Sequence, residues 1–316
     1  GFSRADADLA FARHATSKLA QVEDLDHIAT LGFRGEALAS IAAVSRLTLS
    51  TRARDEETGI LMELEGGNLL RQAPIGRPAG TSLTVEQLFF NVPARLKFLR
   101  TPVTEAGHVS ELVTYYALAY PALRFQLIHN GRTVFRSDGA GELREVLVSA
   151  FGAEVVRQLL EIDSDWDEET HAGPRVSGYV SSPSLNRANR GQMVFFVNGR
   201  WIRDRSLSYA VLQAYHTLLP AGRFPISVVR VDMDPAEVDV NVHPTKSEVR
   251  FREPGRIFGL VQRLVRATLV ARAPVPETNP WPMPALHAAA HAPAGWDWER
   301  RQRLVHAGQA QAELAL

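Results

Sequence analysis

A turn bracketed by two glycines and opening into a helix, Leu31–Leu38 (LGFRGEAL), constrains this chain most strongly. The glycines enclose an aromatic residue and an arginine, and helix formers continue from Glu36 to Ala42 without a breaker. Glycine lets backbone N–H groups approach an anion, and a helix N-terminus leaves its first amides unpaired with a partial positive charge. The stretch therefore suits a phosphate, although taken alone it also fits an ordinary turn.

Composition narrows the class of protein. The 316 residues are 45% hydrophobic and 22% charged with a formal net charge of +0, which is typical of a soluble globular protein long enough for two domains. No apolar run approaches the roughly 20 residues of a membrane span, so we expect a cytoplasmic protein with no membrane partner. The absence of cysteine excludes disulfides and thiolate zinc sites, and the ten histidines lack metal-binding spacing, so no protein-held transition metal is expected.

The first part of the chain shows the pattern of a mixed α/β domain. An amphipathic stretch at residues 4–13 predicts a helix, and alternating polar and apolar residues predict half-buried strands. The helical period and an Asn130-Gly131 turn then predict a helix followed by a hairpin. The expected strands cover 44–52, 60–64 and 83–85, the helix 104–119 and the hairpin 125–135. We expect a largely antiparallel sheet in a domain spanning residues 1–139.

A second compact α/β unit is expected over residues 140–273, after the glycine-rich boundary at 137–141. Asp204 is a plausible N-cap for a helix that runs to Leu219. The other expected elements are helices at 143–151 and 256–271 and strands at 192–197, 225–231 and 238–242. Residues 274–316 are rich in proline, alanine and histidine and predict a linker or tail. The chain opens at Gly1 without an initiator methionine, so it looks cut at its start.

Charge is distributed unevenly. Six acids and no Lys or Arg lie between Glu161 and Glu169. From Asn186 to Arg230 only one acid, Asp204, stands against seven arginines: Arg187, Arg190, Arg200, Arg203, Arg205, Arg223 and Arg230. The arginine block is either a solvated face or the binding surface for a polyanion.

Two lysines occupy positions that suit a phosphate. Lys18 follows two hydroxyl residues, Thr16 and Ser17, where it is either a phosphate ligand or the exposed end of a helix. Lys246 follows a strand and the proline-fixed turn at Pro244. A lysine held by rigid backbone suits a terminal phosphate as a point charge, but it equally suits a solvated strand edge.

Five ordered blocks carry a resemblance to a known family. They read ARHATSK (12–18), LGFRGEALASI (31–41), LFFNVPARLKFL (88–99), FFVNGRWIRDR (195–205) and VDVNVHPTKSEVRF (238–251). The chain resembles the N-terminal region of the MutL family of DNA mismatch repair proteins. The resemblance implies an α/β (α+β) fold: an incomplete GHKL (Bergerat) ATP-binding sandwich, then a transducer domain resembling domain 2 of ribosomal protein S5. A linker and a separate dimerisation domain are expected beyond them.

The resemblance assigns roles to particular residues. Gly1 matches the last glycine of the adenine-site motif, and Thr81 matches a threonine that helps close the adenine pocket. Lys246 matches the transducer lysine that reaches the γ-phosphate, and Arg205 matches an arginine implicated in DNA binding. The start of the ATP lid and its phosphate-binding end are matched by Thr16, Ser17, Lys18, Gly32, Phe33, Arg34, Gly35, Glu36, Ala37 and Leu38. Because Arg205 lies inside the arginine block, the block is interpreted as a DNA-binding surface that includes Arg187, Arg190, Arg200 and Arg203.

The departures from the family pattern limit the activity expected of this chain. The glutamate general base, the asparagine that holds Mg²⁺ and the aspartate that binds the adenine amino group should all lie upstream of Gly1. Glu36 and Glu23 are not credible substitutes for the base, since Glu36 sits where backbone amides should meet phosphates. We expect the intact protein to be a slow Mg-dependent ATPase and residues 1–316 alone to be inactive.

The resemblance also implies a switch. ATP, but not ADP, should draw Lys246 over the γ-phosphate and favour a homodimer of N-terminal regions. DNA, single- or double-stranded, should bind without sequence preference, and the other partners should be a mismatch-recognition protein and a downstream endonuclease or helicase. The alternatives are another GHKL ATPase, of the topoisomerase B subunit or chaperone type, or a DNA or protein interaction module without nucleotide chemistry.

Overall fold

The computed structural model describes residues 1–12, 35–163, 173–240, 242 and 248–271. The chain divides into one unit of Gly1–Ala273 and a second of Pro274–Leu316, and the second lies outside the described residues. In the described part of the first unit the two largest β-sheets have four and five strands, and each is described by itself below. None of the helices in these described ranges is both long enough and apolar enough to cross a membrane.

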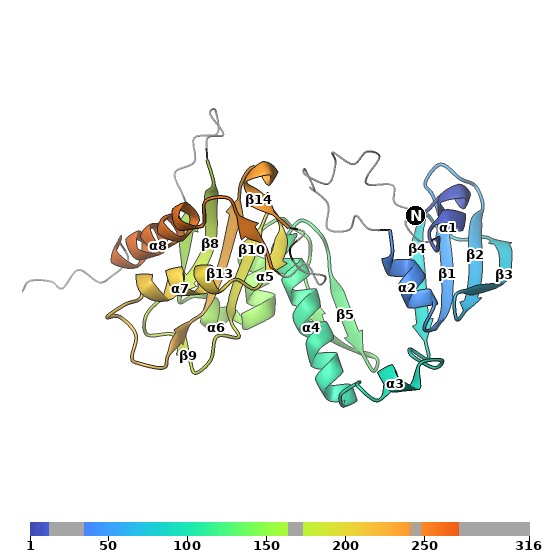
Figure 1. Ribbon diagram of the computed structural model, residues 1–316, viewed down its shortest axis with the longest axis horizontal. Helices are drawn as coiled ribbons and strands as arrows, with labels where there is room; N and C mark the ends of the chain where they lie inside the picture. Colours follow the sequence, from blue (N-terminus) through green and yellow to red (C-terminus); the bar gives the residue numbers. More distant parts are fainter. Residues whose placement is uncertain (13–34, 164–172, 241, 243–247, 272–316) are drawn as a thin grey trace, which may run out of the picture. The chain divides into compact units, whose positions relative to one another are not determined.

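The N-terminal sheet has four antiparallel strands and two short helices (Figure 1). Its strand order is β3 (Asn68–Ile75), β2 (Gly59–Glu65), β1 (Arg46–Arg52) and β4 (Gly80–Glu86). Helices α1 (Arg4–Leu9) and α2 (Ala37–Ala42) contribute Ala7 and Ala42 to a core built on β1 and β2. The largely antiparallel sheet expected from the alternating sequence is confirmed.

Alternation along β1 sets which side chains face this core. Leu47, Leu49 and Thr51 are buried, whereas the residues between them are half-buried. Because successive side chains of a strand point to opposite faces, Thr51 occupies a position where the pattern calls for an apolar residue. Thr51 lies between Ile60 of β2 and Thr81 of β4 in the strand register. A buried hydroxyl at this position needs hydrogen-bond partners.

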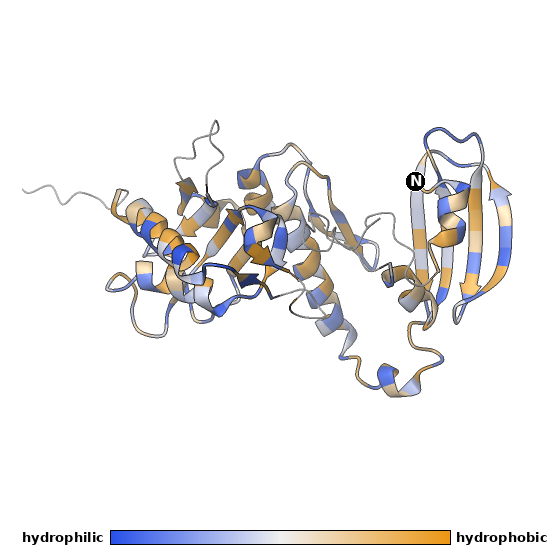
Figure 2. Ribbon diagram, turned by 45° about the horizontal axis from the view of Figure 1, so that its top comes forward, coloured by the Kyte–Doolittle hydropathy of each residue, from blue (hydrophilic) through white to orange (hydrophobic). Residues whose placement is uncertain are grey.

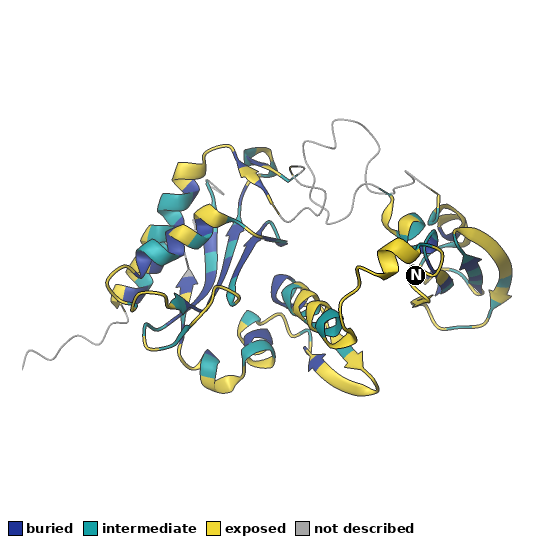
Figure 3. Cartoon of the chain, turned by 60° about the horizontal axis from the view of Figure 1, so that its bottom comes forward, coloured by how far each residue is buried: buried dark blue, intermediate teal, exposed yellow. Residues whose placement is uncertain are grey.

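The second sheet has five strands covered on both faces. Its order is β11 (Arg200–Ile202), β10 (Met193–Val197), β13 (Ser227–Asp232), β8 (Arg175–Ser181) and β7 (Leu159–Asp163). Only β10 and β13 pair in parallel; the other neighbours are antiparallel. These strands are mostly apolar (Figure 2) and largely buried (Figure 3). A sheet that is buried on both faces reads as near-continuous hydrophobic runs, as MVFFV in β10 does.

Adjacent residues of β10 enter different cores. Phe195 packs with α7 (Arg205–Ala214) and α8 (Pro254–Ala271), whereas Phe196 packs with α4 (Pro102–Ala119), α5 (Leu143–Phe151) and the β5–β6 hairpin (Gln126–His129, Arg132–Arg136). The core around Phe196 draws residues from both sides of the expected boundary at 139 and 140, among them Phe135 and Leu147. The domain boundary itself stays a prediction.

Short elements complete the described chain. They are α3 (Pro93–Leu96), α6 (Ala153–Val156), β9 (Asn186–Arg187), β12 (Phe224–Pro225), the 3₁₀ turn Pro235–Glu237, β14 (Val238–Asp239) and β15 (Arg250–Phe251). Strands β9 and β12 pair to form a small ribbon, and β14 pairs with β15.

Several expected elements are confirmed and others end elsewhere. The predicted helix at 143–151 coincides with α5, and Asp204 caps α7 by accepting a hydrogen bond from the Leu207 N–H at 2.7 Å. The prediction that this helix continues to Leu219 is wrong, since α7 ends at Ala214. Thr217 adopts φ 71°, a left-handed conformation that a continuing helix does not tolerate. The strand predicted over 238–242 ends at Asp239.

Candidate functional site

Two residues predicted for the nucleotide pocket, Gly1 and Thr81, lie together in the N-terminal sheet, and Thr51 connects them. The Thr51 hydroxyl accepts a hydrogen bond from the Phe2 N–H at 2.7 Å and lies 2.9 Å from the Thr81 hydroxyl. It also lies 3.3 Å from the Gly80 carbonyl oxygen, to which it can donate. Thr51 therefore connects the N-terminal segment to the start of β4 through hydrogen bonds.

Thr51 belongs to none of the five sequence blocks, but the strand pattern holds a signal that finds it. It is the one hydroxyl residue in the buried phase of β1, after Leu47 and Leu49. A polar residue in that phase is conspicuous because burying a hydroxyl is unfavourable without partners. We name Gly1, Thr51 and Thr81, with the Gly80 carbonyl, the threonine cluster.

Gly1 owes its place in this cluster to the absence of a side chain. A Cβ built on Gly1 would clash with the Arg52 carbonyl and lie 2.8 Å from the Gly80 carbonyl oxygen. Only glycine allows the backbone to approach β1 and β4 this closely. Gly80 is different: it has φ 134°, and a Cβ there would meet nothing nearer than the Arg77 guanidinium at 4.0 Å.

The described end of the predicted lid lies at the start of α2. Gly35 has φ 61°, and Glu36 precedes the helix without a side-chain capping hydrogen bond. Helix α2 begins at Ala37 and contacts β1, and its N-terminal end points toward the end of the sheet where Gly1 lies (Figure 1). The predicted ligands Thr16, Ser17, Lys18, Gly32, Phe33, Arg34 and Lys246 lie outside the described residues.

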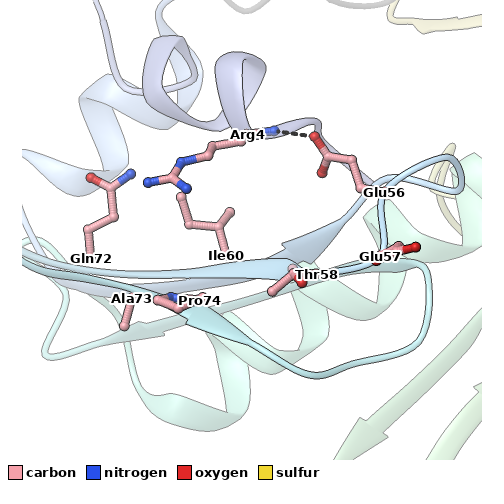
Figure 4. A pocket seen from close by; sticks show the side chains of 9 residues that line it. Arg4, Glu56, Glu57, Thr58, Ile60, Gln72, Ala73 and Pro74 are labelled. Atoms are coloured by element: carbon pink, nitrogen blue, oxygen red, sulfur yellow. Dashed lines mark hydrogen bonds between the residues drawn. The ribbon is translucent and has the colours of Figure 1, made fainter.

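A hollow of about 310 Å³ opens beside the N-terminal sheet, but it holds none of the predicted site residues. It lies between the start of α1, the loop before β2, and strands β2 and β3 (Figure 4). The Arg4 backbone N–H donates to the Glu56 carboxylate at 3.0 Å, and Gln72 donates to Asp8 at 2.8 Å. These bonds tie α1 to the loop before β2 and to β3.

Five of the seven arginines of the block fall into two groups. The first lies on the β9–β12 ribbon, where Arg187 pairs with Phe224 in the strand register. Arg187 donates to the Gln192 side-chain oxygen at 2.8 Å, and Arg223 donates to the Asn186 side-chain oxygen at 2.6 Å. The guanidinium of Arg190 lies over the Phe224 ring, 5.1 Å from its centroid. Each of these contacts is to a neutral group.

The second group surrounds the start of α7. Arg203 and Arg205 are exposed and flank the capping residue Asp204. The Arg203 guanidinium lies 4.9 Å from the centroid of the Trp201 ring. Arg205 occupies the first turn of α7, where the helix dipole disfavours a cation. A cation at an unfavourable place for helix stability is consistent with a role in binding an anion.

Arg200 behaves differently from the other predicted DNA-binding arginines. It is 8% exposed, and burial lowers the pKa of its guanidinium from the ordinary value. The neighbouring phenols of Tyr116 and Tyr120 act in the opposite direction, and burial raises the pKa of Tyr120. Arg200 is thus less accessible to a DNA phosphate than Arg203 or Arg205, and its direct contact with DNA stays a prediction.

Ion pairs with glutamate are formed by a few of the described arginines, all of them outside the arginine block. Arg46, Arg71, Arg157 and Arg256 pair with glutamates. Within the described ranges, none of Arg187, Arg190, Arg203, Arg205 and Arg223 forms an ion pair. Among the described residues Arg54, Arg95 and Arg132 also form no ion pair, so the polyanion interpretation rests on the clustering of the block's arginines and the scarcity of acids among them. The described residues also contain no cluster of three or more His, Asp or Glu side chains that could hold a metal.

Comparison with known proteins gives the arrangement its context. Residues 147–270 match the family model for the C-terminal domain of DNA mismatch repair proteins. The chain is 49% identical over 257 residues to the DNA mismatch repair protein MutL of Desulforamulus reducens, a match covering 81% of this chain and 39% of that protein. It is also 40% identical over 339 residues to the MutL of Solibacter usitatus, covering 100% of this chain and 51% of that protein. The chain thus spans about two-fifths to one half of the curated relatives it matches.

A solved structure supports the same fold. The MutL ATPase domain of Aquifex aeolicus complexed with ADP is 27% identical, with a TM-score of 0.53, and the match covers 78% of this chain and 80% of that one. The predicted GHKL-type α/β fold class is confirmed by this neighbour.

Proposed function

Because this chain belongs to the MutL family of DNA mismatch repair proteins, we propose that it forms an ATP-controlled, DNA-binding region of a repair protein. The family role is DNA mismatch repair. The observation that carries the proposal is the threonine cluster, which joins Gly1 and Thr81 although 79 residues separate them in the sequence. The related Aquifex domain is complexed with ADP, which supports a nucleotide as the ligand here.

The residues of the threonine cluster fit one edge of a nucleotide base. The Thr81 hydroxyl, exposed at the edge of β4, supplies both a donor and an acceptor, and the buried Thr51 hydroxyl holds it in place. Gly80 leaves open space beside them, because a Cβ there would meet nothing nearer than 4.0 Å. We assign this cluster to the base end of ATP, and Gly35–Leu38 with Lys18 and Lys246 to the phosphate end.

Thr81→Val tests the nucleotide assignment, with Thr84→Val as the matched control. The two threonines share β4, but Thr84 faces the opposite side of the sheet and pairs with Thr48. Thr81→Val should weaken binding of a fluorescent ATP analogue about 5- to 10-fold, the effect of losing one hydrogen bond of roughly 1 kcal/mol or slightly more. Thr84→Val should leave affinity unchanged. Equal affinities for both variants and the original chain would remove Thr81 from the site.

We further propose that the 316-residue chain binds ATP without hydrolysing it. The described residues do not supply a cluster of acids for Mg²⁺, so no step is assigned to a metal here. Glu36 lies at the start of α2, where the proposed lid meets phosphate, and is not a base. Turnover above background by the purified chain, abolished by Lys246→Ala, would contradict this proposal.

The DNA-binding assignment rests on the solvent-accessible arginines rather than on Arg200. We propose that Arg187, Arg190, Arg203 and Arg205 bind phosphates, so that DNA binding is independent of sequence. Removing one phosphate-binding arginine should reduce the slope of log affinity against log salt by about 0.9 for duplex DNA and about 0.7 for a single strand. We also propose, because the chain belongs to this family, that ATP promotes a homodimer. On the same ground, we propose that the partners are a mismatch-recognition protein and an endonuclease or helicase.

A salt titration of duplex binding tests this assignment. Arg203→Glu and Arg205→Glu should weaken binding and flatten the slope, whereas Arg46→Glu, at an arginine already paired with Glu65 in the N-terminal sheet, should change neither. Unchanged affinity and slope in the first two variants would make the arginine block a solvated face.

A further inference from the structure

An aromatic stack stands beside the arginines at the start of α7. The rings of Tyr115 and Trp201 are stacked, with centroids 4.7 Å apart and planes at 21°. The Tyr115 hydroxyl donates to the Glu111 carboxylate at 2.5 Å, which fixes the tyrosine on α4. Arg203 completes the stack, since its guanidinium lies over the Trp201 ring. The three groups come from α4, from β11 and from the residue just after β11.

Trp201 is held rigidly yet remains partly accessible. It belongs to β11, the edge strand of the five-stranded sheet, and packs against the core that contains Phe196. Its exposure is intermediate, whereas Arg203 is exposed. A fixed aromatic ring costs little conformational entropy on binding, and its π-face accepts any nucleobase. The arrangement is thus a preformed surface for a flat, unpaired group.

The contact of Arg203 with the ring is weaker than the contact it can make with DNA. A guanidinium over an exposed aromatic ring is held less strongly than one that forms a charge-assisted hydrogen bond to a phosphate. Arg203 therefore gains by turning from the ring to a phosphate, and that movement uncovers the face of Trp201 for a base.

We propose that Trp201 is a stacking platform for one unpaired base of single-stranded DNA, covered by Arg203 in the free protein. This inference rests on the proposed DNA binding by the arginine groups and adds a base contact to it. Bases inside a duplex are already stacked on their neighbours, so Trp201 distinguishes single strands from duplexes. A base stacked on an aromatic side chain contributes about 1–3 kcal/mol without sequence preference.

A comparison of two oligonucleotides isolates the base contact. One is a single strand of 20 thymidine nucleotides. The other has the same length and the same phosphates but carries no bases. The unaltered chain should bind the thymidine strand about 5- to 150-fold more tightly, the range that corresponds to 1–3 kcal/mol. Trp201→Leu should abolish most of this preference and leave the affinity for the abasic strand within about 2-fold.

Further variants separate stacking from other causes. Trp201→Phe keeps an aromatic face and should retain most of the preference for the thymidine strand. This variant keeps the test valid if Trp201→Leu folds poorly. Arg203→Ala should weaken both strands, lower the salt slope by about 0.7 and keep the preference, because it removes a phosphate ligand but not the ring. Phe98→Leu, at an aromatic residue that is 85% exposed outside the stack, is the control and should change nothing.

The outcomes distinguish this inference from the proposed function. If Trp201→Leu still prefers the thymidine strand, the stacking platform is overturned. It is also overturned if Trp201→Phe loses this preference as fully as Trp201→Leu does. Binding of both strands without salt dependence, or no binding at all, overturns the proposed DNA contacts themselves.

Discussion

Replacing Thr51 with valine tests how the threonine cluster is held together. Valine has nearly the same shape but lacks the hydroxyl that accepts from the Phe2 N–H and contacts Thr81 and Gly80. Thr51 is fully buried and its bond to the Phe2 N–H is part-buried, so water has restricted access to the unpaired donor. Leaving a buried donor without a partner costs about 1–3 kcal/mol. We therefore expect Thr51→Val to lower the free energy of unfolding by about 2 kcal/mol.

Urea unfolding and amide exchange measure this effect. A loss of about 2 kcal/mol corresponds to a midpoint lower by roughly 1 M urea for a typical slope of about 2 kcal/mol/M. The Phe2 amide should also exchange faster with solvent, because it loses its acceptor. Thr48→Val is the matched control: Thr48 lies on the same strand, is half-buried and faces the opposite side of the sheet. It should change the free energy by less than about 0.5 kcal/mol. Similar losses in both variants would refute the role assigned to Thr51.

Two further predictions concern the second sheet. Gly178→Ala should lower the free energy of unfolding by about 3 kcal/mol or more, because Gly178 has φ 129° and an added Cβ would clash with the Val228 carbonyl. Thermal unfolding should show this loss, while Gly255→Ala in α8, where the added Cβ meets nothing within 4 Å, should be neutral or stabilising. Asp204→Ala should destabilise α7 by about 1 kcal/mol through loss of its cap, yet tighten DNA binding because it removes the acid between Arg203 and Arg205. Circular dichroism measures the loss of helix stability, and a DNA titration measures the change in affinity. Ser206→Ala, at an exposed residue, is the control for both. Weaker DNA binding by Asp204→Ala would contradict the charge argument.

Local signals predict much of the fold. Helix α5 is bounded correctly because its apolar residues follow the helical period, and the Asn130-Gly131 turn marks the β5–β6 hairpin. Strand β3 escapes prediction because most of its residues are exposed and it lacks an alternating apolar face. It is held instead by backbone pairing with β2, which leaves no mark in composition.

The candidate site is predictable only where motifs are local. The resemblance selects Gly1 and Thr81, but their connection through Thr51 depends on the register of β1 and β4, a long-range property. Burial likewise separates Arg200 from its neighbours. Arg200 and Arg203 look equivalent in the sequence, yet one is enclosed near Tyr120 and the other is exposed over Trp201. Counting charges along a chain does not reveal which of them meet solvent.

Limited proteolysis of residues 16–38 is the sharpest test of an ATP-controlled region in this chain. Trypsin has sites in this segment at Lys18 and Arg34. We predict that a non-hydrolysable ATP analogue slows cleavage at both sites, that ADP protects them less, and that Lys246→Ala abolishes the difference between the two nucleotides. Identical cleavage rates with the ATP analogue, with ADP and without nucleotide would contradict ATP control.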